Sequence, residues 1–161
     1  QTCALPISPF DESTRNGTRL WQLASHAMSQ DDKRRGLRHL AELVRTEVRT
    51  KEGEKARLAL AQSSVKRSAH HRAIDLLKRP TVTHVFERLQ TMALAYEGLE
   101  KYEEAAEIWL QAIQEADNAP RTGEARKGAA RNLFLNGQIS QAEQTLGPAA
   151  KETLAPMIDK V

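Results

Sequence analysis

The amino-acid sequence predicts an all-α fold built from antiparallel helix pairs, for three reasons. Leu, Ala, Glu, Gln, Lys and Arg dominate the 161 residues, and these side chains lose little rotamer freedom in a helix. Aromatic residues make up only 4% of the chain, and it has no long alternating runs of β-branched residues, which would favour strands. Small residues also recur where two helices could approach closely, at Gly36, Ala73, Ala105 and Ala142, with spacings of 37, 32 and 37 residues.

Apolar stripes and helix-breaking residues place the individual helices. We expect them near residues 18–29, 32–49, 52–67, 69–78, 83–98, 102–117, 122–136 and 140–150, with a short further helix after the last. Breaks are expected at Pro80, at Asn118-Ala119-Pro120 and at Asn136-Gly137, because these residue types resist helix continuation.

The connections between helices carry their own signals. Asp31-Asp32 offers a turn and an N-cap for the second helix, and Thr81 and Thr83 are N-cap candidates for the fifth. The segment from Asn118 to Gly123 is rich in loop-forming residues, so we expect it to form a loop.

The stretch from Leu89 to Pro120, LQTMALAYEGLEKYEEAAEIWLQAIQEADNAP, resembles one complete tetratricopeptide repeat, a helix–turn–helix unit of about 34 residues. The residues that carry the resemblance are Leu89, Met92, Ala93, Tyr96, Tyr102, Ala105, Trp109, Ala112 and Pro120. The resemblance implies a right-handed α-solenoid of stacked helix pairs. It further implies a protein–protein interaction scaffold without catalysis, whose partner is a protein or peptide of unknown identity.

The same pattern recurs along the chain. The matched repeat covers about residues 86–120, and a second match over about 121–150 centres on Ala142, although Arg126 stands where a large apolar residue is expected. Two upstream copies, centred on Gly36 and Ala73, match fewer positions. Because a single helix pair cannot bury its apolar face alone, we expect the pairs to stack around one continuous core.

The first seven residues, QTCALPI, match the translation of a widely used sequencing-library adaptor, CAG ACG TGT GCT CTT CCG ATC. We therefore expect residues 1–7 to be a non-native scar and residues 8–161 to form a single helical-repeat domain of a longer protein. Setting the scar aside removes Cys3, the only cysteine, and with it disulfides and cysteine-based zinc sites in this segment. No apolar run approaches the roughly 20 residues that a membrane span needs.

Signatures of catalysis are missing from the sequence. It has no phosphate-binding glycine loop, no HExxH, no GxSxG and no dinucleotide fingerprint. His71 and Asp75 lie one turn apart, but such a pair is far more often a surface hydrogen bond than half of a metal site. We expect no enzymatic activity, no cofactor and no metal.

By analogy with the repeat family, the first helix of each pair lines the concave groove. The analogy nominates six partner-binding residues: Gln90, Leu94, Glu97, Lys127, Arg131 and Phe134. Lys127 and Arg131 lie one turn apart and could meet an acidic group of a partner.

The distribution of charge leaves alternatives open. Residues 8–80 hold 16 Lys/Arg against 9 Asp/Glu, whereas residues 81–161 hold 8 against 12. The basic half could bind nucleic acid, although Glu42, Glu47, Glu52 and Glu54 interrupt it and Trp21 is its only large stacking ring. A further alternative is a regulatory or sensor segment of a larger enzyme or transcription regulator.

Overall fold

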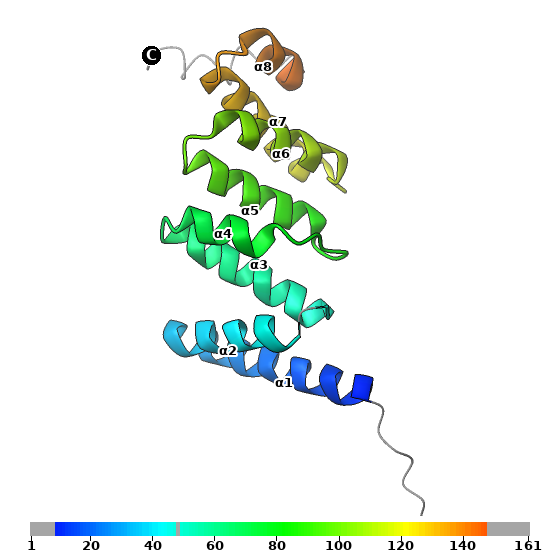
Figure 1. Ribbon diagram of the computed structural model, residues 1–161. Helices are drawn as coiled ribbons and strands as arrows, with labels where there is room; N and C mark the ends of the chain where they lie inside the picture. Colours follow the sequence, from blue (N-terminus) through cyan, green and yellow to red (C-terminus); the bar gives the residue numbers. More distant parts are fainter. Residues whose placement is uncertain (1–8, 48, 148–161) are drawn as a thin grey trace, which may run out of the picture. The chain divides into compact units, whose positions relative to one another are not determined.

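The computed structural model describes residues 9–47 and 49–147, and every regular element in these ranges is an α-helix (Figure 1). The helices are α1 (Pro9–Ser29), α2 (Lys33–Thr46), α3 (Lys51–Lys66), α4 (His70–Leu77), α5 (Val85–Glu97), α6 (Tyr102–Gln114), α7 (Ala119–Leu135) and α8 (Ile139–Leu146). The chain divides into two compact units, one up to Leu60 and one from Ala61 onward. The single domain expected over residues 8–161 stays a prediction, and residues 1–7 lie outside the described ranges.

In the first unit, α1 and α2 pack against each other. Ala24 of α1 and Leu40 and Leu43 of α2 are buried. A Cβ at Gly36 would lie 2.6 Å from the Sδ atom of Met28 in α1, so the small residue lets the two helices approach. This is the role that the sequence predicted for the first small marker.

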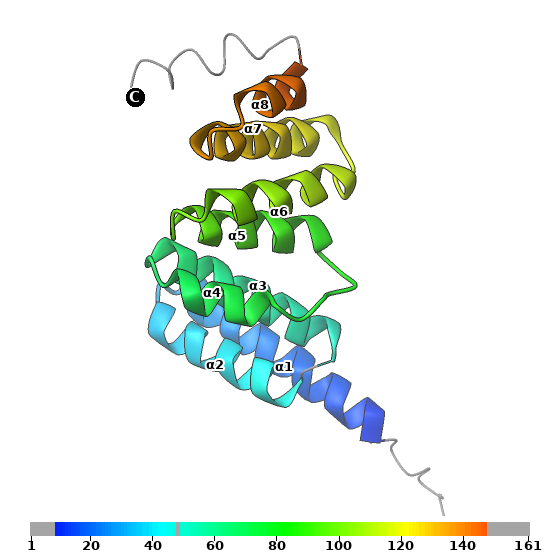
Figure 2. The ribbon, with the colours of Figure 1, turned by 45° about the horizontal axis from the view of Figure 1, so that its top comes forward.

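In the second unit, α4 packs on α5, α5 on α6, α6 on α7 and α7 on α8 (Figure 2). One apolar cluster holds Phe86, Leu89, Ala93, Trp109, Ala112, Ala125 and Ala129, and a second holds Ala106, Ala130, Leu133, Ala142 and Leu146. The three small markers of this unit, Ala73, Ala105 and Ala142, are fully buried. The predicted all-α fold of stacked antiparallel helix pairs is confirmed.

The turn inside each helix pair has the same backbone conformation. Asp31, Ser68, Glu100 and Gly137 have φ values of 58°, 57°, 58° and 79°, and each stands two residues before the second helix of its pair. Their spacing is 37, 32 and 37 residues, the spacing of the four small markers. The irregular spacing of the small markers in the sequence is therefore also the spacing of the turns in the structure. The two weaker upstream copies have the same turn as the two downstream ones.

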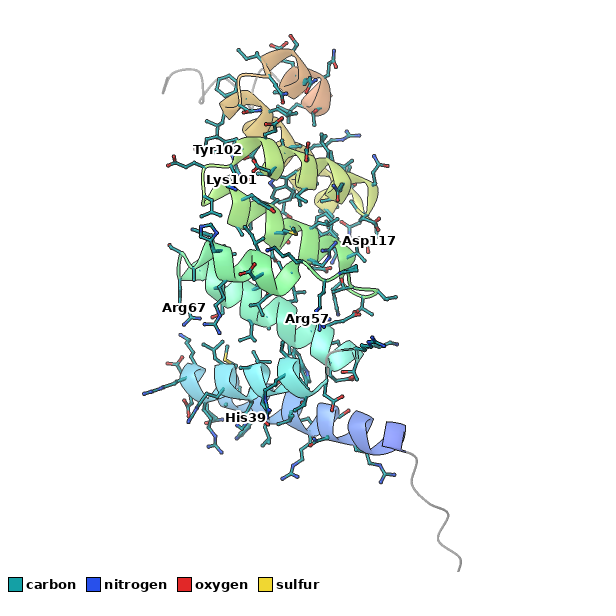
Figure 3. All side chains as sticks on the ribbon, viewed as in Figure 1. His39, Arg57, Arg67, Lys101, Tyr102 and Asp117 are labelled. Carbon is teal, nitrogen blue, oxygen red and sulfur yellow. The ribbon has the colours of Figure 1, made fainter. Side chains whose placement is uncertain are left out.

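A shared hydrogen bond accompanies this turn. The residue after each left-handed position donates its N–H to the carbonyl five residues earlier: Asp32 to Ala27, Ala69 to Ser64, Lys101 to Tyr96 and Gln138 to Leu133, at 2.8–3.0 Å. Such bonds satisfy carbonyl groups that the end of a helix leaves without an intrahelical partner. Figure 3 labels Lys101 and Tyr102 at the turn where α6 begins.

Several predicted helix boundaries are wrong. The first helix begins at Pro9 instead of residue 18. Proline is compatible with the first turn of a helix, and the helix continues through Gly17. The predicted loop from Asn118 to Gly123 is also wrong, since α7 begins at Ala119 and holds Pro120 in its first turn. The Asn118 side chain caps this helix by accepting a hydrogen bond from the Arg121 N–H at 3.0 Å.

One predicted N-cap is confirmed and two are wrong. Asp32 caps α2 as expected, because its carboxylate accepts a hydrogen bond from the Arg35 N–H at 3.1 Å. Neither Thr81 nor Thr83 caps α5, which begins at Val85 after a left-handed residue, His84. The helix end predicted at residue 150 and the short helix after it lie outside the described residues.

The repeated turn predicts opposite effects of glycine at two of its positions. A left-handed conformation costs a non-glycine residue roughly 1–2 kcal/mol. We expect Glu100→Gly to raise the free energy of unfolding by about 1 kcal/mol. Gly137→Ala should lower it by about 1 kcal/mol.

Urea unfolding followed by circular dichroism measures both changes. Glu103→Gly in α6 is the control, and it should be destabilising by about 1 kcal/mol because glycine is a poor helix former. If Glu100→Gly is destabilising to the same extent, the left-handed turn is not formed in solution.

Candidate functional site

Three regularly spaced side-chain bonds join α5, the first helix of one pair, to α7, the first helix of the next, and a fourth runs from Asn132 to Glu97. The three regular bonds link residue i of α5 to residue i+34 of α7: Glu87 with Arg121, Gln90 with Glu124 and Glu97 with Arg131. The Gln90–Glu124 bond is 2.7 Å long and the Glu97–Arg131 bond 2.5 Å. These bonds hold the two helices at a fixed register.

The same register places Gly128 opposite Leu94, where the row of side-chain pairs is interrupted. An open groove of about 550 Å³ lies beside these two residues. It is lined by Leu94, Trp109, Pro120, Gly123, Glu124, Lys127, Gly128 and Arg131. The groove lies wholly within the second unit.

The floor of the groove is the indole ring of Trp109. This ring is only 2% exposed and packs in the apolar cluster between α6 and α7. A Cβ at Gly128 would lie 2.4 Å from the Cε2 atom of Trp109, closer than real Cβ contacts allow. Glycine at this position therefore lets α7 rest directly on the indole ring.

The Glu97 carboxylate fixes the orientation of the floor and of one wall. Its Oε1 atom accepts hydrogen bonds from Trp109 Nε1 at 2.7 Å and Asn132 Nδ2 at 2.6 Å, and its Oε2 atom accepts one from Arg131. The fully buried Asn132 also donates to the Gly128 carbonyl at 2.8 Å. Since the Glu97 side chain is only 17% exposed, these charge-assisted bonds lie in a weakly screened environment.

The charged groups that line the groove differ in their partners. Glu124 accepts a bond from Gln90, and Arg131 is paired with Glu97. Lys127 is exposed, and among the described residues no hydrogen bond or ion pair is found for its ammonium group. The groove thus presents one cation that has no partner within the described part of the chain.

The six nominated residues fall into two groups. Leu94, Lys127 and Arg131 line the groove, and the Leu94 side chain is 37% exposed. Gln90 and Glu97 form part of the frame that joins α5 to α7, whereas Phe134 is half-buried against the cluster between α6, α7 and α8. Their role in partner binding stays a prediction.

The sequence did not nominate five of the eight residues that line the groove. Trp109 was considered only as a residue of the repeat pattern, and Pro120 and Gly123 were expected in a loop. Gly128 carried no expectation, although a glycine inside an otherwise helical segment is a known sign of close approach. That signal, at Gly123 and Gly128 of one helix, could have located the groove.

Other candidate sites lie outside the groove. The Asp75 carboxylate, nominated with His71 as a doubtful half-site for metal, accepts a hydrogen bond from the Lys78 ammonium group at 2.8 Å. This bond and the charge of Lys78 lower the pKa of Asp75. Within residues 9–47 and 49–147 there is no group of three or more His, Cys, Asp or Glu side chains placed to hold a metal ion. The helices described there are also too short or too polar to cross a membrane.

Comparisons with known proteins identify the fold. No family model and no curated protein matches the sequence. Two crystal structures of TPR-like repeats, from a Podosopora anserina protein described as a kinesin light chain and from a single-substitution variant of it, match in three dimensions. Their TM-scores are 0.61 and 0.63, at 16% identity, and the match covers 98% of this chain and 80% and 81% of theirs. The chain therefore has a TPR-like helical-repeat fold, as the sequence predicted.

The close approach of α7 to Trp109 predicts different effects of alanine at two glycines of the same helix. Gly128→Ala should lower the free energy of unfolding by about 2 kcal/mol, because its Cβ overlaps a buried and hydrogen-bonded ring. Gly123→Ala should leave stability unchanged or raise it by about 0.5 kcal/mol, because its Cβ meets nothing within 4 Å. Urea unfolding of the two variants tests this, and equal effects would contradict the contact.

The Glu97 network predicts an asymmetry between its members. Glu97→Ala should cost about 3 kcal/mol, because it leaves the buried N–H groups of Trp109 and Asn132 without an acceptor. Arg131→Ala should cost about 1 kcal/mol, since Arg131 is 40% exposed and Glu97 keeps two donors. Thermal and urea unfolding measure both changes.

The matched control is Glu104→Ala, which breaks only an exposed pair between Glu104 of α6 and Lys101, the residue before this helix. It should change stability by less than about 0.5 kcal/mol. Equal losses for Glu97→Ala and Glu104→Ala would show that the network is not formed.

Proposed function

We propose that this chain is a non-catalytic scaffold that binds a segment of a partner protein in the groove between α5 and α7. The observation that carries the proposal is a groove of about 550 Å³ on the TPR-like fold, a fold that generally mediates protein–protein interaction. This volume lies in the range of sites that bury most of a small ligand or a short peptide. The proposal concerns the second unit alone.

The mechanism is binding to a preformed surface. The bonds from Gln90 and Glu97 to α7 hold the groove open before the partner arrives, which lowers the entropy cost of association. Leu94, Lys127 and Arg131 are the side chains that would contact the partner, because they line the groove. Phe134 supports α7 from the neighbouring apolar cluster.

Nucleic-acid binding by the first unit is less well supported. Arg34, Arg35 and Arg38 are exposed on α2, which favours an anionic ligand. However, the Lys55 ammonium group already lies over one face of the Trp21 ring, 5.9 Å from its centroid, and would compete with a base for that face. We therefore favour a protein partner, whether this chain acts alone or as the regulatory segment of a larger protein.

Selection from a displayed library of random peptides tests the proposal without knowledge of the natural partner. The full chain is immobilised, and the selected peptides are then measured against Gly123→Leu. A leucine at this position meets open space and fills the groove without disturbing the core. We expect affinity for Gly123→Leu to fall at least about tenfold.

The control variant is Gln141→Leu, which adds an exposed leucine on α8, away from the groove. It should bind the selected peptides as the unchanged chain does. Peptides that bind all three proteins equally, or a selection that yields no peptide, would refute binding in this groove.

A further inference from the structure

We infer that the groove selects an extended segment in which an aliphatic side chain and a carboxylate lie two residues apart. This inference rests on the proposed function and specifies its ligand. It follows from three features of the groove: an apolar depression, a lysine without a partner among the described residues, and a glutamate that a hydrogen bond holds in place.

The apolar depression lies where the row of side-chain pairs is interrupted. The Leu94 side chain forms one wall and Trp109 forms the floor, while the opposite wall, α7, carries no side chain at Gly123 and Gly128. Because Trp109 is only 2% exposed, little ring surface is offered for stacking by another aromatic group. A compact branched aliphatic side chain fills such a depression best.

The cation is Lys127, the residue before Gly128. Glu124 and Arg131, the other ionised groups of the groove, already have bonding partners in Gln90 and Glu97. A ligand carboxylate would therefore find its counter-ion in Lys127. Alternate side chains of an extended segment point to the same side, about 7 Å apart, which is within reach of the long lysine side chain.

The carboxylate of Glu124 limits where a ligand can carry negative charge. It lies one turn before Lys127 on α7 and is held in place by Gln90. An acidic residue on the Glu124 side of the aliphatic anchor would face a like charge. We therefore expect one ligand carboxylate on the Lys127 side of the anchor to strengthen binding. A second carboxylate, on the Glu124 side, should not strengthen it further.

Titration of the isotope-labelled full chain with short synthetic peptides, followed by NMR, tests the inference. The peptides share Gly/Ser flanks and contain Leu-Ser-Glu, Leu-Ser-Gln, Ser-Ser-Glu or Glu-Ser-Leu-Ser-Glu. The indole N–H of Trp109 reports on the groove, and that of Trp21 in the first unit is an internal control.

We expect Leu-Ser-Glu to shift the Trp109 signal while the Trp21 signal stays in place. Replacing either the leucine or the glutamate should weaken binding about tenfold. The peptide with two glutamates should bind no more tightly than the peptide with one. In Lys127→Gln, which changes an exposed side chain, the preference for Leu-Ser-Glu over Leu-Ser-Gln should disappear.

Other results would overturn the inference. Equal binding of Leu-Ser-Glu and Leu-Ser-Gln would remove the role of Lys127, and tighter binding of the doubly acidic peptide would indicate non-specific attraction. If library peptides bind the groove but lack the aliphatic–acidic pair, the ligand chemistry is wrong while the proposed function stands. If no library peptide depends on the groove, both fail.

Discussion

The second unit depends on one close contact, the indole ring of Trp109 against the backbone of Gly128. Any larger residue at 128 would push α7 away from α6. Because Asn132 and Arg131 are also on α7, that displacement would move them away from Glu97 of α5, with which they bond. The contact therefore determines the register of α5 and α7, and with it the shape of the groove.

The residues that stabilise this region and those proposed to bind a partner overlap only in part. The Glu97 carboxylate satisfies the buried N–H groups of Trp109 and Asn132, which would otherwise lack an acceptor. The same network pairs the charges of Glu97 and Arg131 with each other. Lys127 takes no part in these bonds. A partner that pairs with its ammonium group would therefore leave the stability of the fold nearly unchanged.

The repeat pattern could be predicted from the sequence because it depends on local rules. The small markers at Gly36, Ala73, Ala105 and Ala142 each follow a left-handed turn by five residues, so their spacing reports the period of the backbone itself. The start of α7 could not be placed, because Pro120 is compatible with both a loop and the first turn of a helix. The Asn118 side chain, which caps the first turn of α7, stabilises the helix over the loop.

The groove was only partly predictable, for a physical reason. The analogy nominated Leu94, Lys127 and Arg131, which do line it. The bonds of Glu97 and Gln90, however, join residues about one repeat apart, and which charges pair depends on packing that no local pattern encodes. Trp109 serves both as packing and as a floor, a combination that helical periodicity does not reveal.

The most direct test of this account is a measurement of nuclear Overhauser contacts between the Trp109 indole ring and Gly128 in the unliganded chain. We expect strong contacts from the ring protons to the α-protons of Gly128, because a Cβ at this residue would lie 2.4 Å from the ring. If these contacts are absent while the helices are formed, α7 does not rest on the indole ring. The groove would then not exist before a partner binds.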